Sequence, residues 1–91
     1  MKEKIRYARL QWQGTVIRFA LPADEEIELA VFNLTGQKVA TLAEGVREAS
    51  SYTVHWDGRD DSGHLLSSGV YLYRLRAGQR HIETRKLLLL R

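Results

Sequence analysis

Apolar and polar residues alternate with a period of two along most of this chain, which predicts β-strands rather than helices. In the segment TVIRFALP, Ile17, Phe19 and Leu21 share an apolar face, from which we exclude the polar Thr15 and Arg18. The proline that ends this segment cannot donate a hydrogen bond to a sheet, so the strand stops there.

The same alternation recurs in shorter segments that turn signals separate. The further predicted strands cover residues 26–34, 37–45, 51–58, 69–78 and 80–91. Thr35-Gly36 and Ala77-Gly78-Gln79 are turns between them, and Glu44-Gly45 ends the strand before it. Because Leu87–Leu90 breaks the alternation, we expect the last strand to be covered on both faces. Six to seven short strands, about ten residues apart, predict an all-β sandwich.

The length and composition fit one small domain. The chain has 91 residues, of which 44% are hydrophobic and 27% charged, and no cysteine. We expect residues 1–13 to be an irregular segment or an edge strand, and residues 14–91 to form the sandwich. The first residues lack the apolar core of a signal peptide, so we expect no export signal in this chain. No apolar run approaches the ~20 residues that a membrane-spanning helix needs, so we expect no membrane insertion.

Basic residues gather toward the C-terminal end. From residue 74 onward, Glu83 is the one acid among six basic residues, which are Arg74, Arg76, Arg80, Arg85, Lys86 and Arg91. A basic stretch can bind nucleic acid. Here the basic residues alternate with apolar ones, as on the solvated face of a strand, so we predict no nucleic-acid partner.

The most polar stretch is HWDGRDDSGHLLSSGVY, residues 55–71. An EF-hand loop starting at Asp57 would place Arg59 at a ligand position, which excludes that pattern. A looser calcium site formed by Asp57, Asp60 and Asp61 stays open as an alternative. The favoured interpretation is a turn, because Asp-Gly and Ser-Gly pairs supply the φ > 0 and the local hydrogen bonds that turns need.

No arrangement of side chains predicts catalysis or a cofactor. The three histidines, His55, His64 and His81, are too widely spaced for a local zinc motif. We expect His55 and His81 to lie on strand faces opposite the apolar ones, in solvent. The chain also lacks a glycine-rich phosphate loop and a nucleophile elbow. We therefore predict that it is not an enzyme and binds no cofactor.

Aromatic residues offer a different candidate site, for sugar rings. Trp56 is in phase with Tyr52 and Val54, so we expect it in the core. Trp12, Tyr7 and Tyr73 remain candidates for an exposed stacking surface.

Three motifs together resemble a known family. WDGRD followed by SGVYLYRL spans residues 56–75, RKLLL spans residues 85–89, and a spaced motif precedes both with Leu34, Gly36, Val39 and Leu42. Over residues 14–91 the chain resembles the C-terminal sorting domain (Por secretion type A) of proteins exported by the type IX secretion system of Bacteroidetes. It is also similar to the immunoglobulin-like domain of the flagellar hook-capping protein. The sorting-domain family usually has a Tyr-Pro-Asn-Pro-Phe-type motif before the first strand, whereas this chain has RYARLQWQGT there.

The resemblance implies a single immunoglobulin-like β-sandwich of about seven antiparallel strands with no catalytic role. It implies a sorting signal at the end of a larger cargo protein, bound by secretion translocon proteins, and a secreted or cell-surface location. The residues expected to carry recognition are Gly69, Val70, Tyr71, Arg85, Lys86, Leu87, Leu88 and Leu89. Two alternatives stay open: an accessory carbohydrate-binding or structural surface module of a polysaccharide-degrading enzyme, and weak self-association.

Overall fold

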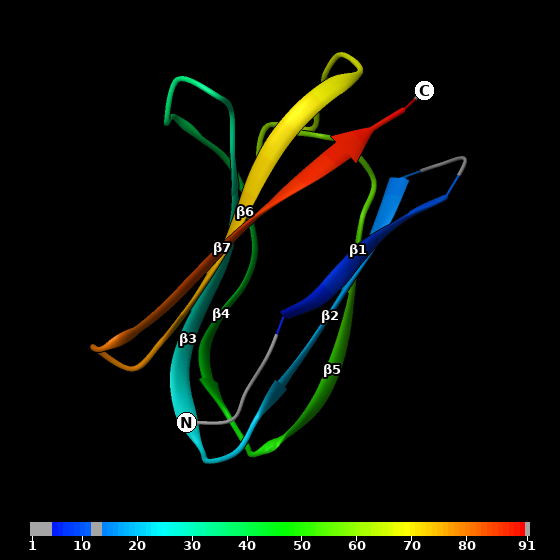
Figure 1. Ribbon diagram of the computed structural model, residues 1–91. Coiled ribbons are helices and arrows are strands. Elements are labelled where there is room, and N and C mark those ends of the chain that lie inside the picture. Colours follow the sequence, from blue (N-terminus) through cyan, green and yellow to red (C-terminus); the bar gives the residue numbers. More distant parts are fainter. Residues whose placement is uncertain (1–4, 12–13, 91) are drawn as a thin grey trace.

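The computed structural model describes the backbone of residues 5–11 and 14–90, and the side chains of residues 15–90. The described part of the chain is all-β, as predicted, and Figure 1 shows two sheets facing each other. The strands are β1 (Ile5–Gln11), β2 (Gly14–Leu21), β3 (Glu25–Phe32), β4 (Lys38–Arg47), β5 (Ser50–Trp56), β6 (Gly69–Ala77) and β7 (His81–Leu89). One sheet has the order β1-β2-β5 and the other β4-β3-β6-β7, and every pair is antiparallel.

The core lies between the two sheets, where every second residue of a strand points inward. Its fully buried side chains come from both layers and include Ile17, Leu29, Val31, Tyr73 and Leu75. This inner layer supplies most of the hydrophobic stabilisation, at about 25 cal/mol per Å² of apolar surface buried.

Trp56 occupies this core, as predicted from its phase. Its side chain is buried, and its ring packs edge-to-face on Tyr71 at 5.7 Å between centroids. Because Trp56 ends β5 in one sheet and Tyr71 lies on β6 in the other, the pair joins the two layers where the chain crosses between them.

Three expectations about the strands are wrong: the face on which Thr15 lies, the end of a strand at Gly45, and the burial of Leu87–Leu90 on both faces. Thr15 is buried on the same face as Ile17, because its side chain lies opposite Trp56 in the β2–β5 ladder. The second strand of the β3–β4 pair does not end at Gly45 but continues to Arg47. Gly45 has φ +109°, a conformation that glycine adopts without strain, so the strand passes through it.

The leucines of the last strand alternate after all. Leu87 and Leu89 are buried, whereas Leu88 and Leu90 are 43% and 52% exposed. Only one face of β7 is therefore covered, and the apolar run reflects two different surfaces rather than a strand buried on both sides. The hydrophobic pattern could not separate these cases, because leucine occupies both faces.

The N-terminal region contains an edge strand. β1 pairs with β2 at the margin of the three-stranded sheet, with a register shift between Ile5 and Ala8. Residues 1–4, 12–13 and 91 lie outside the described part of the chain. Within that part, no helix is both long and apolar enough to cross a membrane.

Candidate functional site

The aspartates of the loop between β5 and β6 bind backbone N–H groups. Asp57 Oδ1 accepts from the N–H of Arg59 at 3.1 Å, and Asp60 Oδ1 accepts from those of Ser62 and His64 at 2.9 Å each. The hydrogen bond from the His64 N–H is the main reason why the pKa of Asp60 is lowered, and the Ser62 N–H adds to it. These are the local hydrogen bonds by which aspartate stabilises turns.

Asp61 makes a longer connection, from the loop to β4. Its Oδ1 accepts from the N–H of Thr41 at 3.0 Å, and its own N–H donates to the carbonyl oxygen of Val39 at the same distance. Among the described residues, no three His, Cys, Asp or Glu side chains converge as metal ligands would. The looser calcium site of Asp57, Asp60 and Asp61 stays an open alternative to the turn.

A cavity of about 620 Å³ opens beside this loop and is bordered by Thr41, His55, Trp56 and Arg59. The indole N–H of Trp56 donates to the carbonyl oxygen of Arg59 at 2.9 Å, and the ring is 3% exposed. The cavity therefore offers no aromatic face on which a sugar ring could stack.

The other aromatic candidates for a sugar-binding surface are Tyr73, Trp12 and Tyr7. Tyr73, one of the candidates for an exposed stacking surface, is fully buried, so it cannot contribute to such a surface. Its position on β6, in phase with Tyr71 and Leu75, places it in the core. Trp12 and Tyr7 lie outside the residues whose side chains the structure describes.

The histidines do not meet. His55 is exposed on β5, as expected, and His64 is exposed in the loop. His81 contradicts the prediction, because it points to the same face of β7 as Leu87 and Leu89 and is partly buried. Its Nε2 lies 3.7 Å from Oε1 of Glu83.

The predicted recognition residues come together on β6 and β7, although about fifteen positions separate them in the sequence. The ladder sets Gly69 opposite Leu89, Tyr71 opposite Leu87, and Val70 opposite Leu88. Leu72, which we did not single out, lies opposite Lys86. The sequence predicted the two segments correctly as partners in one hairpin.

These residues divide between two faces. Tyr71, Leu87 and Leu89 are buried in the core, so a partner cannot reach them in the folded domain. On the outer face, Lys86 is exposed, and Val70 and Leu88 are 41% and 43% exposed. We call the set Val70, Leu72, Lys86 and Leu88 the outer patch.

Arg85 belongs to neither group. Its register places it on the inner side of β7, yet 51% of its side chain is exposed. Its guanidinium donates to Glu83 Oε2 at 3.0 Å. The inner side of the first half of β7 is therefore charged, whereas its second half is apolar.

A cluster of charges adjoins the outer patch. Glu28 on β3 forms an ion pair with Lys38 on β4, and its Oε1 lies 3.5 Å from both Arg74 and Arg76 on β6. The hydrogen bond from Lys38 is the main reason why the pKa of Glu28 is lowered, and the two arginines lower it further. No local motif predicts this cluster, because Lys38 and the two arginines lie ten to 48 positions from Glu28 in the sequence.

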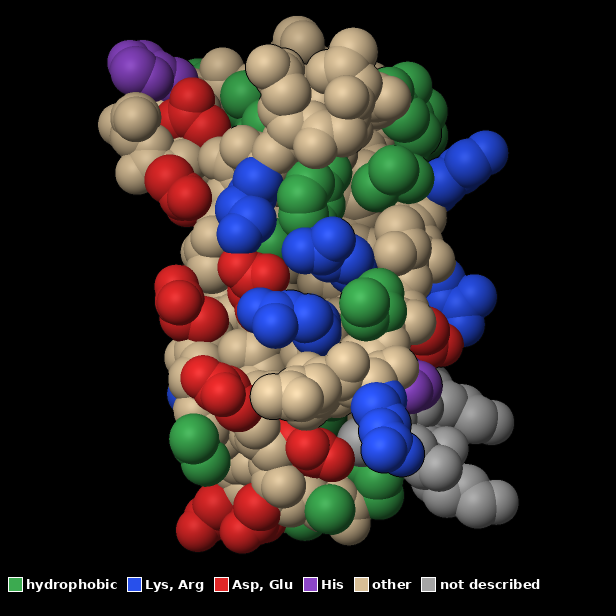
Figure 2. Space-filling view, turned by 90° about the vertical axis from the view of Figure 1, so that its left-hand side faces the viewer, with side chains coloured by type: hydrophobic (Ala, Val, Ile, Leu, Met, Phe, Trp, Pro, Cys, Tyr) green, Lys and Arg blue, Asp and Glu red, His purple; other side chains and the backbone are tan. Residues whose placement is uncertain are grey.

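The outer face of the four-stranded sheet is therefore predominantly basic at its centre. Figure 2 shows Lys and Arg side chains gathered in the middle of this face, with acidic side chains along one margin. The guanidinium of Arg74 lies 4.6 Å from the ring centre of Phe32, so part of the charge rests on an aromatic face. The surface combines positive charge with apolar side chains, as protein-binding surfaces often do.

Two antiparallel sheets of three and four strands, packed around one core, define an immunoglobulin-like β-sandwich. The family model of the FlgD Ig-like domain matches residues 8–80, and the chain belongs to this family. The predicted relation to the immunoglobulin-like domain of the hook-capping protein is confirmed. The matched region ends before β7. No curated protein matches the chain.

Proposed function

We propose that this domain is a non-catalytic sorting module at the end of a larger exported protein, recognised by proteins of the type IX secretion translocon. The observation that carries the proposal is the outer patch. In it, two segments that resemble the sorting family form one surface on the outer face of the sheet, with Val70 opposite Leu88 and the partly buried Leu72 opposite Lys86. The cargo would then be secreted or held at the cell surface.

The buried residues among the predicted recognition residues have a structural role in this proposal. Tyr71 and Leu87 lie opposite each other in the core, and the Tyr71 hydroxyl donates to the carbonyl oxygen of Ser67 at 2.8 Å. They fix the hairpin so that the outer patch keeps one shape. A motif can thus be required for sorting although the translocon contacts only every second residue of it.

To test the proposal, the domain is fused to the C-terminus of a periplasmic reporter and expressed in a host with a type IX system. We expect the reporter in the medium or on the cell surface, and retention in the periplasm would contradict the proposal. The control is the same fusion in a strain that lacks the translocon. Deleting residues 85–91 is a poor test, because it removes Leu87 and Leu89 from the core and would unfold the domain.

A second candidate is a structural module in a surface assembly, which the family match favours. A structural module would not redirect the reporter, so the same experiment separates the two functions. Trp56, Tyr71 and Tyr73 are buried, so the carbohydrate-binding alternative has no support from these three aromatic residues. Retardation of the domain in gels containing xylan or cellulose would revive it.

A further inference from the structure

The four-stranded sheet has one regular open edge. Among the described residues, β7 forms a ladder with β6 alone, and nine residue pairs follow one another in it without a register shift. The opposite edge strand, β4, has two register shifts against β3. Bulges of that kind protect an edge from pairing with another chain, and β7 has no such protection in its ladder.

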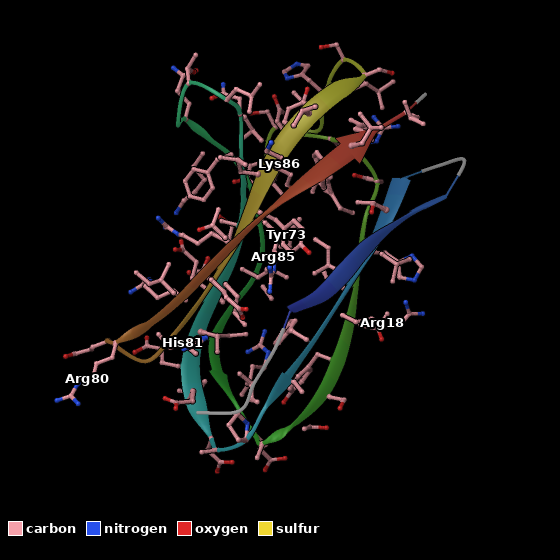
Figure 3. All side chains as sticks on the ribbon, viewed as in Figure 1. Arg18, Tyr73, Arg80, His81, Arg85 and Lys86 are labelled. Atoms are coloured by element: carbon pink, nitrogen blue, oxygen red, sulfur yellow. The ribbon has the colours of Figure 1, made fainter. Side chains whose placement is uncertain are left out.

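The first half of β7 also projects away from the other sheet. Figure 1 shows the turn between β6 and β7 reaching past β3, far from β1, β2 and β5. Arg80 lies at this projecting end in Figure 3. β1 comes near β7 across the sandwich, but no ladder joins the two strands. A strand from another molecule can therefore approach the edge.

Charges along β7 restrict which strand can pair there. Glu83 and Arg85 lie on the inner side of β7, and Lys86 lies on its outer side. In an antiparallel ladder, residues directly opposite each other face the same side of the sheet, and like charges in these positions are destabilising. Two copies of β7 paired about a two-fold axis must therefore avoid setting any of these residues against itself.

Centring the pair on Thr84 meets this condition. Centring on Glu83, Arg85 or Lys86 would set each of these charges opposite its own copy. A centre at Thr84 instead sets Glu83 of each copy opposite Arg85 of the other copy. Both of these cross-strand pairs are then of opposite charge. Thr84 then faces Thr84 of the second copy, a favourable cross-strand pair.

We propose that β7 is a self-association surface, at which a second copy of this chain adds its own β7 in antiparallel register centred on Thr84. The two four-stranded sheets then form one continuous eight-stranded sheet across a two-fold axis. The interface is isologous, because both copies use the same residues. The register centred on Thr84 is the one that pairs Glu83 with Arg85 of the second copy, and this association goes beyond the sorting function.

Mixing two charge variants tests the pairing between molecules. Glu83→Arg gives a chain with two arginines at these positions, and Arg85→Glu gives one with two glutamates. Either variant alone sets like charges against each other in the proposed register. In an equimolar mixture, however, both cross-strand pairs become Arg–Glu. The ion pair within each chain stays broken in the mixture, so restored association reports the contact between chains.

Sedimentation equilibrium on the whole chain gives the readout. We expect the wild-type mass to rise with concentration from 10.5 kDa toward twice that value. We expect each variant to stay at the mass of one chain, and the mixture to regain the two-chain mass. A wild type that stays monomeric at millimolar concentration, or a mixture no heavier than its components, overturns the proposal.

A matched pair of exposed threonines guards against effects on folding. Thr84→Lys sets two lysines against each other at the two-fold centre and should abolish association. Thr53→Lys makes the same change on β5, an edge strand of the other sheet, and should leave association unchanged. Equal loss of association in both variants, with circular dichroism spectra like wild type, would also overturn the proposal.

Discussion

Asp61 Oδ1 accepts a hydrogen bond from the backbone N–H of Thr41 at 3.0 Å, and this contact attaches the polar loop to β4. The N–H of Asp61 donates to Val39, so the residue holds the strand from two positions. Both contacts fall where β4 departs from regular pairing with β3. Asp61 thus satisfies backbone groups that the β3–β4 ladder leaves open, which explains the aspartate at this position of the loop.

Replacing Asp61 should destabilise the domain without affecting its fold. We expect Asp61→Ala to lower the free energy of unfolding by about 1–2 kcal/mol, because the Thr41 N–H loses its acceptor. Asp61→Asn keeps an acceptor oxygen and should lose less than half as much. Urea denaturation measures both changes. Equal losses in the two variants would show that the charge of Asp61, rather than its hydrogen bond, stabilises the loop.

Calcium should not stabilise the protein. The carboxylates of Asp57, Asp60 and Asp61 each already accept backbone hydrogen bonds that a metal ion would disturb. We expect the same melting temperature in excess Ca²⁺ and in EDTA at constant ionic strength. A saturable rise with Ca²⁺ that Mg²⁺ does not reproduce would establish the calcium site instead, by linkage between binding and folding.

Tyr73→Phe should preserve or increase stability. The Tyr73 hydroxyl is buried and has no hydrogen-bond partner among the described residues, and an unsatisfied buried group is costly. Burial also raises the pKa of Tyr73 above its ordinary value of 10.0. Above pH 10 the tyrosine ionises more readily in the unfolded chain, so wild-type stability falls as the pH rises.

Thermal melts between neutral pH and pH 11 check this account. Tyr73→Phe should melt at or above the wild-type temperature at pH 7, and should lose less stability at alkaline pH. Tyr73→Ala, which leaves a cavity, should cost about 3–5 kcal/mol. A Tyr73→Phe variant that is clearly less stable at pH 7 would mean that the hydroxyl has a partner.

Glu28 should make stability depend on pH in the acid range. Because the pKa of Glu28 is lowered in the folded state, its contribution is present above its ordinary pKa of 4.5 and is lost as the pH falls through the folded value. We expect Glu28→Gln to reduce stability by roughly 1–2 kcal/mol at pH 7. The difference from wild type should shrink as the pH falls below 4.5.

Glu26→Gln is the matched control for this measurement. Glu26 lies on the same strand and the same sheet face as Glu28, but its side chain is exposed. Denaturation curves between pH 3 and 7 should separate the two variants at neutral pH and bring them together in acid. Parallel pH profiles for wild type and Glu28→Gln would contradict the assigned role of Glu28.

The sequence predicted the strands well because one-sided burial imposes a period of two. It also predicted the core position of Trp56 from its phase with Val54. The alternation of apolar and polar residues failed where the residue type does not match its environment. Thr15 is polar but buried, and Leu88 is apolar but exposed. Each exception depends on what lies across the ladder, which a local pattern does not contain.

The candidate site was predicted as segments but not as a surface. The motif residues of β6 and β7 were identified, yet the register of the hairpin decides that Lys86 faces outward and Leu87 inward. The ion pairs of Glu28 with Lys38 and Arg74 join three strands and leave no signal at a fixed spacing. Long-range pairing of this kind becomes visible only once the sheet order is known.

A comparison of two surface substitutions tests whether a translocon recognises the outer patch. Leu88→Asp changes the outer patch, whereas Val46→Asp makes the same change on β4, at a side chain that is 73% exposed. Both fusions are assayed for export of the reporter, after matching melting temperatures establish that both are folded. We predict that Val46→Asp is exported like wild type and that Leu88→Asp is retained. Normal export of the folded Leu88→Asp fusion would contradict the account.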